Sequence, residues 1–286
     1  MLLAPVDYYR ADSLDDAAEA LSETDGARVL AGGQSLISLL KLRATSVDLL
    51  VDISRLDELR FVDLADDGSV RIGAGMTYDE VEHSETVQAA LPIVSQVAAR
   101  TVDQQIRNRG TIGGNICHND PINNFPVLSV ALGATMHLTG SGGERDVAAE
   151  DFYTGFFSTT VEAGEILHSV TFPALEEGYS VGWNEVEIGE AAARAVALVK
   201  TENGSIGEAR LALGCLPVPT LRPNTAAALQ GAETSAEAVA EATSGVTEGI
   251  DFFPDDPDGT SDYRRALAPV VAKRAVMSAL GGGEDE

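Results

Sequence analysis

Two glycine pairs constrain this chain more than any other feature of its sequence. The first lies in the segment Ala31-Gly32-Gly33-Gln34-Ser35, and the second lies in Thr111-Ile112-Gly113-Gly114-Asn115. Without a Cβ atom, consecutive backbone N–H groups can point into one concavity, and an anionic ligand can approach the main chain. A single pair usually makes only a tight turn. Two pairs, each followed by an amide side chain, leave two interpretations open, a pair of turns or a phosphate site.

The first segment has a further property that favours an anion. Ser35 starts an apolar helix that we expect to extend to Leu42, so the helix dipole would add to the attraction without any lysine. Neither segment has the spacing of a dinucleotide-binding G-x-G-x-x-G turn or of a G-x-x-x-x-G-K-[ST] loop. The residues by themselves therefore predict a site for a phosphate-bearing cofactor without identifying it.

The two motifs, together with Asp120-Pro121, resemble the FAD-binding medium subunit of the molybdenum hydroxylases, the group of aerobic carbon monoxide dehydrogenase and xanthine dehydrogenase. The resemblance spans nearly the whole chain. It implies an α+β fold: a two-lobed FAD-binding domain of the PCMH type, similar to that of the vanillyl-alcohol oxidase superfamily, and a smaller C-terminal α+β domain with an antiparallel sheet and helices. We expect the FAD-binding domain at 1–174, with lobes of about 1–55 and 56–174, and the C-terminal domain at 175–286.

The resemblance also implies which residues hold FAD. In such proteins the two glycine motifs cradle the pyrophosphate, side chains following the glycines add hydrogen bonds, and an apolar pair downstream lies against the ring system. No catalytic side chain and no metal ligand is expected. The FAD-binding residues implied in this chain are Ala31, Gly32, Gly33, Gln34, Ser35, Leu36, Thr111, Ile112, Gly113, Gly114, Asn115, Asp120, Asn124, Ile166 and Leu167.

Two departures from the family pattern concern the surroundings of the flavin. Asn124 stands where the family often has an aspartate, and an amide can still accept a hydrogen bond there and can also donate one. The stretch Asn184 to Ala192 lacks the lysines and the aromatic residue that family members tend to carry. Ala191 would therefore leave one flavin face open. The flavin potential and the electron acceptor are not fixed by the sequence.

The function that the resemblance implies is electron transfer by an FAD subunit, from an iron–sulfur partner to an external acceptor. A large molybdopterin-binding subunit and a small iron–sulfur subunit would complete the complex, as a dimer of heterotrimers. The two cysteines, Cys117 and Cys215, are too few to ligate an iron–sulfur cluster, which agrees with that division. Two alternatives stay open: a flavin-free structural subunit of such a complex, and a self-contained flavin oxidase.

Charge excludes one large class of partner. The chain has 45 acidic and 19 basic residues and a formal net charge of −26, and only Lys41, Lys200 and Lys273 are lysines. Nucleic-acid affinity comes mostly from lysine and arginine, so nucleic-acid binding is not expected. An acidic, lysine-poor surface suits the cytoplasm of a salt-accumulating cell, although an acidic mesophilic protein would look similar.

No apolar run reaches the roughly 20 residues of a membrane helix, and the N-terminus lacks a signal peptide. We therefore expect a cytoplasmic protein.

Hydrophobic periodicity and turn residues predict the elements. Thr77 and Glu80 form a capping-box pattern at the start of a helix. Trp183 is expected to pack within the second domain, and Cys117 to be a small buried residue rather than a redox thiol. We expect strands at 27–31, 49–53, 165–172, 179–187, 195–202 and 208–216, a hairpin of 59–64 with 69–74, and helices at 35–42, 92–100, 126–132, 234–249 and 262–280.

Overall fold

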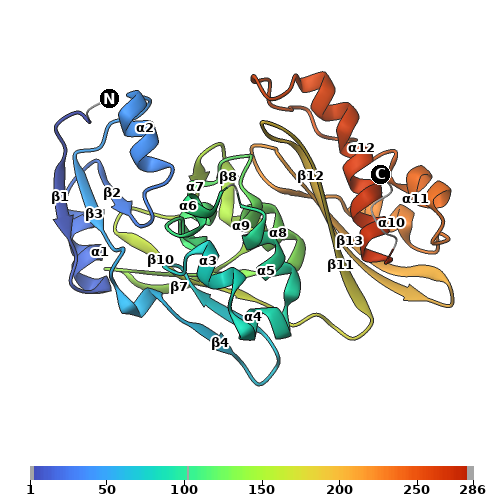
Figure 1. The fold of residues 1–286 in the computed structure, drawn as a ribbon, viewed down its shortest axis with the longest axis horizontal. Coiled ribbons are helices and arrows are strands. Elements are labelled where there is room, and N and C mark those ends of the chain that lie inside the picture. Colours follow the sequence, from blue (N-terminus) through green and yellow to red (C-terminus); the bar gives the residue numbers. More distant parts are fainter. Residues whose placement is uncertain (1–2, 102, 282–286) are drawn as a thin grey trace. The chain divides into compact units, whose positions relative to one another are not determined.

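The computed structural model describes residues 3–101 and 103–281 and divides into two compact units (Figure 1). The N-terminal unit comprises residues 1–118, 134–152 and 158–174. The C-terminal unit comprises residues 119–133, 153–157 and 175–286. Two short segments of the first 174 residues thus belong to the C-terminal unit. No helix among the described residues is long and apolar enough to cross a membrane.

The N-terminal unit contains two sheets. Three parallel strands have the order β1-β3-β2, and five antiparallel strands have the order β4-β5-β10-β6-β7. Its strands are β1 (Asp7–Arg10), β2 (Ala27–Leu30), β3 (Leu49–Asp52), β4 (Val62–Leu64), β5 (Val70–Gly73), β6 (Thr135–Gly140), β7 (Gly143–Ala148), β9 (Ser158–Thr159) and β10 (Glu165–Phe172). Its helices are α1 (Leu14–Glu23), α2 (Leu36–Leu42), the 3-10 helix η1 (Asp57–Leu59), α3 (Tyr78–Glu82), α4 (Glu85–Ala90), α5 (Pro92–Ala99), α6 (Gln104–Arg107), α7 (Ile112–His118) and α9 (Ala149–Phe152).

Local sequence signals explain where these helices begin. The capping box at Thr77 is confirmed: its hydroxyl accepts a hydrogen bond from the Glu80 N–H, and the Glu80 carboxylate accepts one from the Thr77 N–H. Ser13 caps α1, since its hydroxyl accepts a hydrogen bond from the Asp16 N–H. Pro92 occupies the first turn of α5, where its missing N–H costs nothing. The left-handed residue Arg43, at φ 60°, ends α2.

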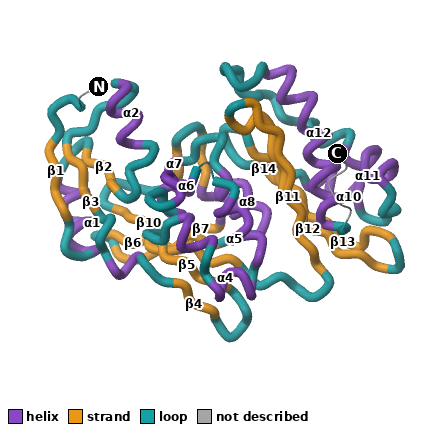
Figure 2. Tube along the Cα trace, viewed as in Figure 1, coloured by secondary structure: helices purple, strands orange, loops and turns teal. Residues whose placement is uncertain are grey.

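The C-terminal unit is an antiparallel sheet with helices on both faces (Figure 2). The strand order is β11-β12-β13-β14. Alternate residues of β12 contact opposite layers: Ala195 and Ala197 belong to the core beneath α12, whereas Arg194 bonds the segment that leads into α8. The elements are α8 (Asn124–Leu132), β8 (Tyr153–Gly155), β11 (Tyr179–Ile188), β12 (Glu190–Glu202), β13 (Ser205–Gly214), β14 (Thr220–Leu221), α10 (Pro223–Leu229), α11 (Ala236–Thr243) and α12 (Ser261–Ala279).

Small residues allow the long helix α12 to lie close to this sheet. A Cβ atom added to Gly182 of β11 would stand 1.9 Å from the carbonyl oxygen of Ala275. The backbone of α12 therefore approaches the backbone of β11 directly. The alanines of β12, including Ala193 and Ala197, are buried in the same layer. This packing explains an alanine-rich strand whose residues have low intrinsic strand propensity.

Most expected elements are confirmed, and the differences have physical reasons. The strand expected at 195–202 begins five residues earlier, because residues 190–194 pair with β11. The helix expected at 234–249 ends at Thr243, before Gly245. The hairpin is shorter than expected, since Leu59 lies in η1. Helix α10 was not expected, although Pro223 at its first position is a typical signal.

Candidate functional site

Gly32 of the first motif contacts the backbone of Arg109 and Gly110, which directly precede the second motif and lie 77 and 78 residues later in the sequence. A Cβ atom added to Gly32 would stand 2.0 Å from the carbonyl oxygen of Arg109 and 2.9 Å from the Cα atom of Gly110. No side chain fits between two main chains at this distance. The structure thus brings together two segments that the sequence singled out separately.

The first motif leaves backbone donors open. It connects β2 to α2, and Gly33 adopts φ +70°, a conformation that favours glycine. Two acceptors in the motif are used internally: Gln34 Nε2 donates to the Gly32 oxygen at 2.9 Å, and the Ile37 N–H donates to the Gly33 oxygen at 3.3 Å. Within the part of the chain that the structure describes, the N–H groups of Gly32, Gly33 and Gln34 have no acceptor. Three consecutive donors at the entrance of a helix suit an anionic group.

The second motif differs from our expectation. Gly113 and Gly114 were expected to form a turn with open N–H groups, but both lie inside α7. The Gly113 N–H donates to the Ala74 oxygen at 3.0 Å, and the Gly114 N–H donates to Thr111 Oγ1 at 3.0 Å. The expectation of an anion nest is therefore wrong for these two N–H groups. A Cβ atom on Gly113 would stand 2.5 Å from the Cβ atom of Ala74, so this glycine is required for packing.

Side chains near the second motif hold it in place. Asn115 is buried and hydrogen-bonds the hydroxyl of Tyr78, a buried side chain whose pKa is raised by desolvation. The Tyr78 N–H donates to the Gly110 oxygen at 3.0 Å, and Thr77 forms a β-bridge with Thr111. Tyr78 therefore contacts the motif at both its backbone and its side chain, a role that sequence reasoning missed. The capping box directly before Tyr78 was the only sequence signal at that position.

The apolar pair Ile166 and Leu167 lies on β10, in the same unit as both motifs. Both side chains are buried. The next residue, His168, accepts a hydrogen bond from the Ala74 N–H at 2.9 Å, and the Ala74 oxygen in turn accepts from Gly113. A continuous set of backbone contacts therefore links the apolar pair to the second glycine motif.

Asp120 and Asn124 belong to the C-terminal unit. Asp120 Oδ1 accepts from the Ile122 N–H at 3.2 Å, and Asn124 is buried in the first turn of α8. The guanidinium of Arg194 fixes this segment, because Nη1 donates to the carbonyl oxygens of Ile122 and Asn123 at 2.8 and 2.9 Å. Sequence reasoning missed Arg194, although a single arginine in a run of alanines indicates a buried ion pair.

Arg194 is held in turn by Glu185. Both Nε and Nη2 of Arg194 lie 2.8 Å from Glu185 Oε2, and the two side chains are 2% and 10% exposed. The guanidinium also stands 5.2 Å from the ring centroid of Trp183. Trp183 is buried within the C-terminal unit, so its expected packing role is confirmed.

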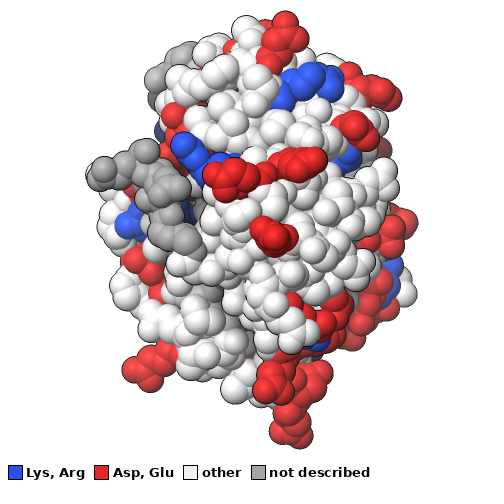
Figure 3. Space-filling view, turned by 90° about the vertical axis from the view of Figure 1, so that its right-hand side faces the viewer, with Lys and Arg blue, Asp and Glu red and all other residues white. Residues whose placement is uncertain are grey.

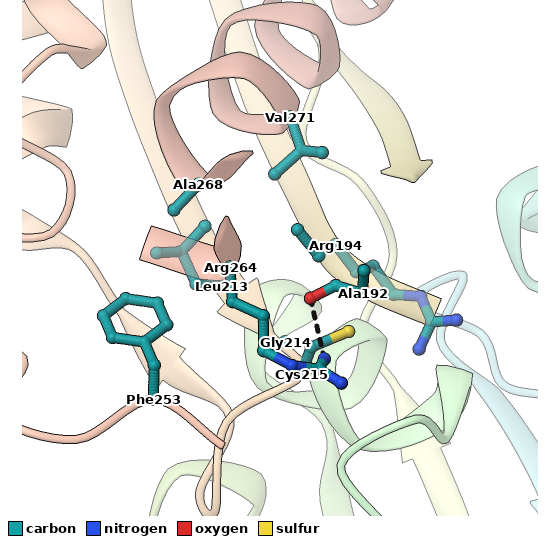
Figure 4. Close-up of a pocket in the computed structure, with 10 residues that line it drawn as sticks. Ala192, Arg194, Leu213, Gly214, Cys215, Phe253, Arg264, Ala268 and Val271 are labelled. Carbon is teal, nitrogen blue, oxygen red and sulfur yellow. Dashed lines mark hydrogen bonds between the residues drawn. The ribbon is translucent and has the colours of Figure 1, made fainter. Parts of the chain in front are cut away.

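A small cavity of about 10 Å³ in the same unit is formed around Arg264 and Cys215 (Figure 4). Arg264 donates to the Ala192 oxygen at 2.8 Å and to Asp256 Oδ1 at 2.5 Å. Burial raises the pKa of the Cys215 thiol. A cavity of this volume holds at most one water molecule, so it is no cofactor site.

Cys117 follows the second motif in α7. Burial raises the pKa of its thiol to about 12. The thiolate is the reactive form of cysteine, so this residue has the properties of a packing residue rather than of a redox thiol.

Two family models match this chain. Residues 4–175 match the family model of the FAD binding domain in molybdopterin dehydrogenase, and residues 189–279 match that of the CO dehydrogenase flavoprotein C-terminal domain. The chain is 36% identical to the glyceraldehyde dehydrogenase medium chain of Sulfolobus acidocaldarius over 94% of this chain and 96% of that protein. It is 35% identical to the carbon monoxide dehydrogenase medium chain of Afipia carboxidovorans, with 98% of each chain covered.

The fold is also shared with solved structures. Carbon monoxide dehydrogenase from Hydrogenophaga pseudoflava superposes with a TM-score of 0.93 at 32% identity, with 99% of each chain covered. Quinoline 2-oxidoreductase from Pseudomonas putida gives a TM-score of 0.93 at 31% identity, again with 99% of each chain covered. These matches confirm the expected α+β fold.

Proposed function

Because the chain belongs to the family of FAD-binding subunits of molybdopterin dehydrogenases, we propose that it is the electron-transfer subunit of a molybdenum-containing hydroxylase. It binds FAD and is an oxidoreductase subunit. Bound FAD supplies the capacity to take up and release electrons, and the protein supplies binding, orientation and electrostatics. Neither the flavin-free structural subunit nor the self-contained oxidase is favoured by any observation.

The residues of the N-terminal unit fit this cofactor. The open N–H groups of Gly32, Gly33 and Gln34 offer hydrogen bonds to an anionic oxygen, which suits a pyrophosphate in a chain with few lysines. Because Gly32 has no side chain, the backbone of the first motif contacts the backbone of Arg109, just before the second motif. We propose that FAD is held by Ala31, Gly32, Gly33, Gln34, Ser35, Leu36, Thr111, Ile112, Gly113, Gly114, Asn115, Ile166 and Leu167, within a sequence domain of residues 1–174. The expected contributions of Asp120 and Asn124 stay predictions.

The second motif takes a positioning role in this proposal. Since the N–H groups of Gly113 and Gly114 are used within the chain, the motif offers a close backbone surface rather than free donors. Gly114 is exposed, and an added Cβ atom would meet only Thr111 Oγ1, at 2.9 Å. A ligand can therefore approach the main chain at Gly114 while the helix α7 stays intact.

We propose a small iron–sulfur subunit as electron donor and a large molybdopterin-binding subunit as the site of substrate oxidation, in a dimer of heterotrimers. Relatives of this chain are named medium chains or FAD-binding subunits, which supports such partners. Both cysteines are free, and Cys215 is buried, so no cysteine cluster for an iron–sulfur centre exists among the described residues.

We also propose a salt-rich cytoplasm as the working environment. The net charge of −26 supports this.

The flavin site is tested with the purified chain and its absorption spectrum. We expect visible flavin bands in the wild-type protein. Gly114→Asp adds a carboxylate at the exposed glycine of the second motif, and repulsion of an anionic cofactor should reduce the flavin content to below about one tenth. Gly142→Asp, on an exposed turn with no atom within 4 Å of an added Cβ, is the matched control and should keep its flavin. Circular dichroism should be unchanged in both variants.

Two outcomes separate failure of the site from failure of the function. Full flavin occupancy in Gly114→Asp contradicts the placement of the cofactor. A wild-type chain without flavin contradicts the function itself and favours the structural subunit. Dye reduction with carbon monoxide, purines or aldehydes is expected only when the chain is co-expressed with its two partners, and turnover by the chain alone would favour the self-contained oxidase.

A further inference from the structure

A groove in the C-terminal unit contains none of the residues assigned to FAD. It has a volume of about 380 Å³, within the range of about 300–1,000 Å³ that is typical of small-molecule sites. It lies beside β13 and β14, and α10 forms one wall. Its lining combines the polar side chains of Arg210, Arg222 and Gln230 with the apolar residues Leu221, Ala226 and Ala227.

The sheet edge in this groove lacks a strand partner. The Arg222 N–H donates to the Leu211 oxygen at 2.8 Å, so this carbonyl faces the edge occupied by β14. Backbone polar groups of alternate residues face the same edge of a strand, so Ala209 presents its N–H and C=O there too. Strand β14 pairs only with the two residues after Leu211. Among the described residues, pairing on this edge resumes at Ile206, whose N–H donates to the Ala232 oxygen at 2.9 Å. The backbone of Ala209 is therefore available within the groove.

Arg222 carries a buried donor that the protein does not use. One Nη of Arg222 donates to the Glu248 oxygen, which fixes the side chain. Its Nε is buried without a hydrogen-bond partner, and Arg222 makes no ion pair within the described residues. Burial lowers the pKa of Arg222, with Glu248 acting in the opposite direction. The Nη1 of Arg222 also has no acceptor among the described residues, and unlike Nε it is not buried, so it is the donor that an anion in the groove can reach.

The charges around the groove favour an anion. Arg210 is anchored by a 2.9 Å hydrogen bond from Nη2 to the Val130 oxygen, so a second guanidinium is held at the lining. Glu208 also lines the groove, but its carboxylate accepts from the Tyr179 hydroxyl at 2.8 Å and lies 3.4 Å from Lys200 Nζ. Lys200, which also lies 3.9 Å from Glu202 Oε1, thus offsets part of the negative charge of Glu208. Two arginines at one groove are notable in a chain with 45 acidic and 19 basic residues.

We propose that this groove binds a small organic carboxylate, with the anionic group at Arg222 and a compact apolar body against Ala226 and Ala227. A planar carboxylate matches the donor geometry of a guanidinium. The volume exceeds what an inorganic anion fills, and the apolar wall offers contact area that such an anion cannot use. The site is independent of FAD binding.

Titration calorimetry of the full chain with its flavin, at fixed KCl concentration, tests the proposal. Benzoate is the probe, because it joins a carboxylate to a flat apolar ring. Benzamide has the same shape without the charge, and inorganic phosphate has the charge without the ring. We expect benzoate to bind at least about tenfold more tightly than either. Equal binding of benzamide or phosphate, or no benzoate binding, would overturn the proposal.

Three variants locate the site. Arg222→Gln should weaken benzoate binding at least about tenfold. Arg274→Gln, which removes the same charge from an exposed position on α12, should leave it unchanged. Ala227→Trp fills the groove from its exposed wall without altering Arg222, and should abolish binding. The thermal midpoint and the flavin content of each variant show that the fold and the FAD site are intact. Wild-type benzoate affinity in Arg222→Gln or Ala227→Trp refutes this placement.

Discussion

At the scale of single residues, the glycines of the two motifs serve different purposes that the sequence does not distinguish. Gly33 adopts a positive φ, Gly32 permits backbone contact with Arg109, and Gly113 permits contact with Ala74. Of these four glycines only Gly114 is exposed, and an added Cβ atom there would meet a side-chain atom, Thr111 Oγ1 at 2.9 Å, rather than backbone. The pattern predicted that the glycines matter. It could not show which contacts they permit, because those contacts join segments far apart in the chain.

Gly32→Ala should therefore destabilise the protein before it affects any ligand. The new Cβ atom would stand 2.0 Å from the Arg109 oxygen, so the two motifs must separate. We expect the free energy of unfolding to fall by about 1–3 kcal/mol, measured in urea. Gly142→Ala meets no atom within 4 Å and is the control. Equal stability of the two variants would contradict the contact between the motifs.

Tyr78→Phe tests the support beneath the second motif. The change removes the hydroxyl that hydrogen-bonds Asn115 and keeps the ring that packs against Gly110. A buried amide that loses a partner costs about 1–3 kcal/mol. We expect a loss of stability in that range and a weaker affinity for FAD in equilibrium titrations. Retention of wild-type FAD affinity would show that Asn115 is positioned without Tyr78.

At the scale of elements, pairing and packing between distant segments decide what local patterns cannot. The helices α2, α5, α8 and α12 and most strands with apolar runs were predicted close to their observed bounds, whereas the short capped helices α1, α4 and α6 were not predicted. The start of β12 was not, because Ala191 to Ala193 become a strand only by pairing with β11 and packing beneath α12. The helical position of Gly113 and Gly114 was missed for a similar reason, since the Ala74 carbonyl that accepts from Gly113 comes from another element.

The pair of Arg194 and Glu185 joins β12 to β11 and to the segment before α8. Arg194→Met removes the guanidinium that pairs with the buried carboxylate of Glu185 and donates to the carbonyl oxygens of Ile122 and Asn123. We expect the free energy of unfolding to fall by about 3–5 kcal/mol. The double variant Arg194→Met with Glu185→Met should recover part of this loss in urea unfolding. No recovery would show that the bonds to the two carbonyls, rather than the ion pair, dominate.

A second ion pair, at the start of β10, predicts a pH dependence. The Arg145 guanidinium bonds Glu165 at 2.6 and 2.7 Å and, with the Glu162 N–H, holds the pKa of Glu165 below its ordinary value of 4.5. A carboxylate whose pKa is lower in the folded state stabilises the fold above the unfolded pKa. This contribution is lost as the pH falls from about 5 through the folded pKa. Glu165→Gln should flatten the stability profile in that acidic range and leave its slope near neutral pH unchanged.

At the scale of the whole molecule, the chain divides in a way that its sequence order conceals. The segments 119–133 and 153–157 belong to the C-terminal unit although they precede residue 174. Hydrogen bonds from Arg194 to Asn123 and from Arg210 to Val130 tie the first segment to the C-terminal sheet. No composition shift marks these segments. The first segment belongs to the C-terminal unit through contacts with arginines that follow it by 71 and 80 residues in the sequence.

Net charge is a property of the whole surface. Figure 3 shows one face of the C-terminal unit, with acidic side chains scattered over it and few basic ones. A formal net charge of −26 makes the folded chain repel itself at low ionic strength. The Debye length falls from about 10 Å at 0.1 M salt to about 3 Å at 1 M, so this repulsion is screened in molar KCl. We expect the thermal midpoint to rise steeply with KCl, and to rise far less with an uncharged osmolyte at equal osmolality. A flat response to KCl would mean that acidic groups are far enough apart not to interact, and it would remove the support for a salt-rich cytoplasm.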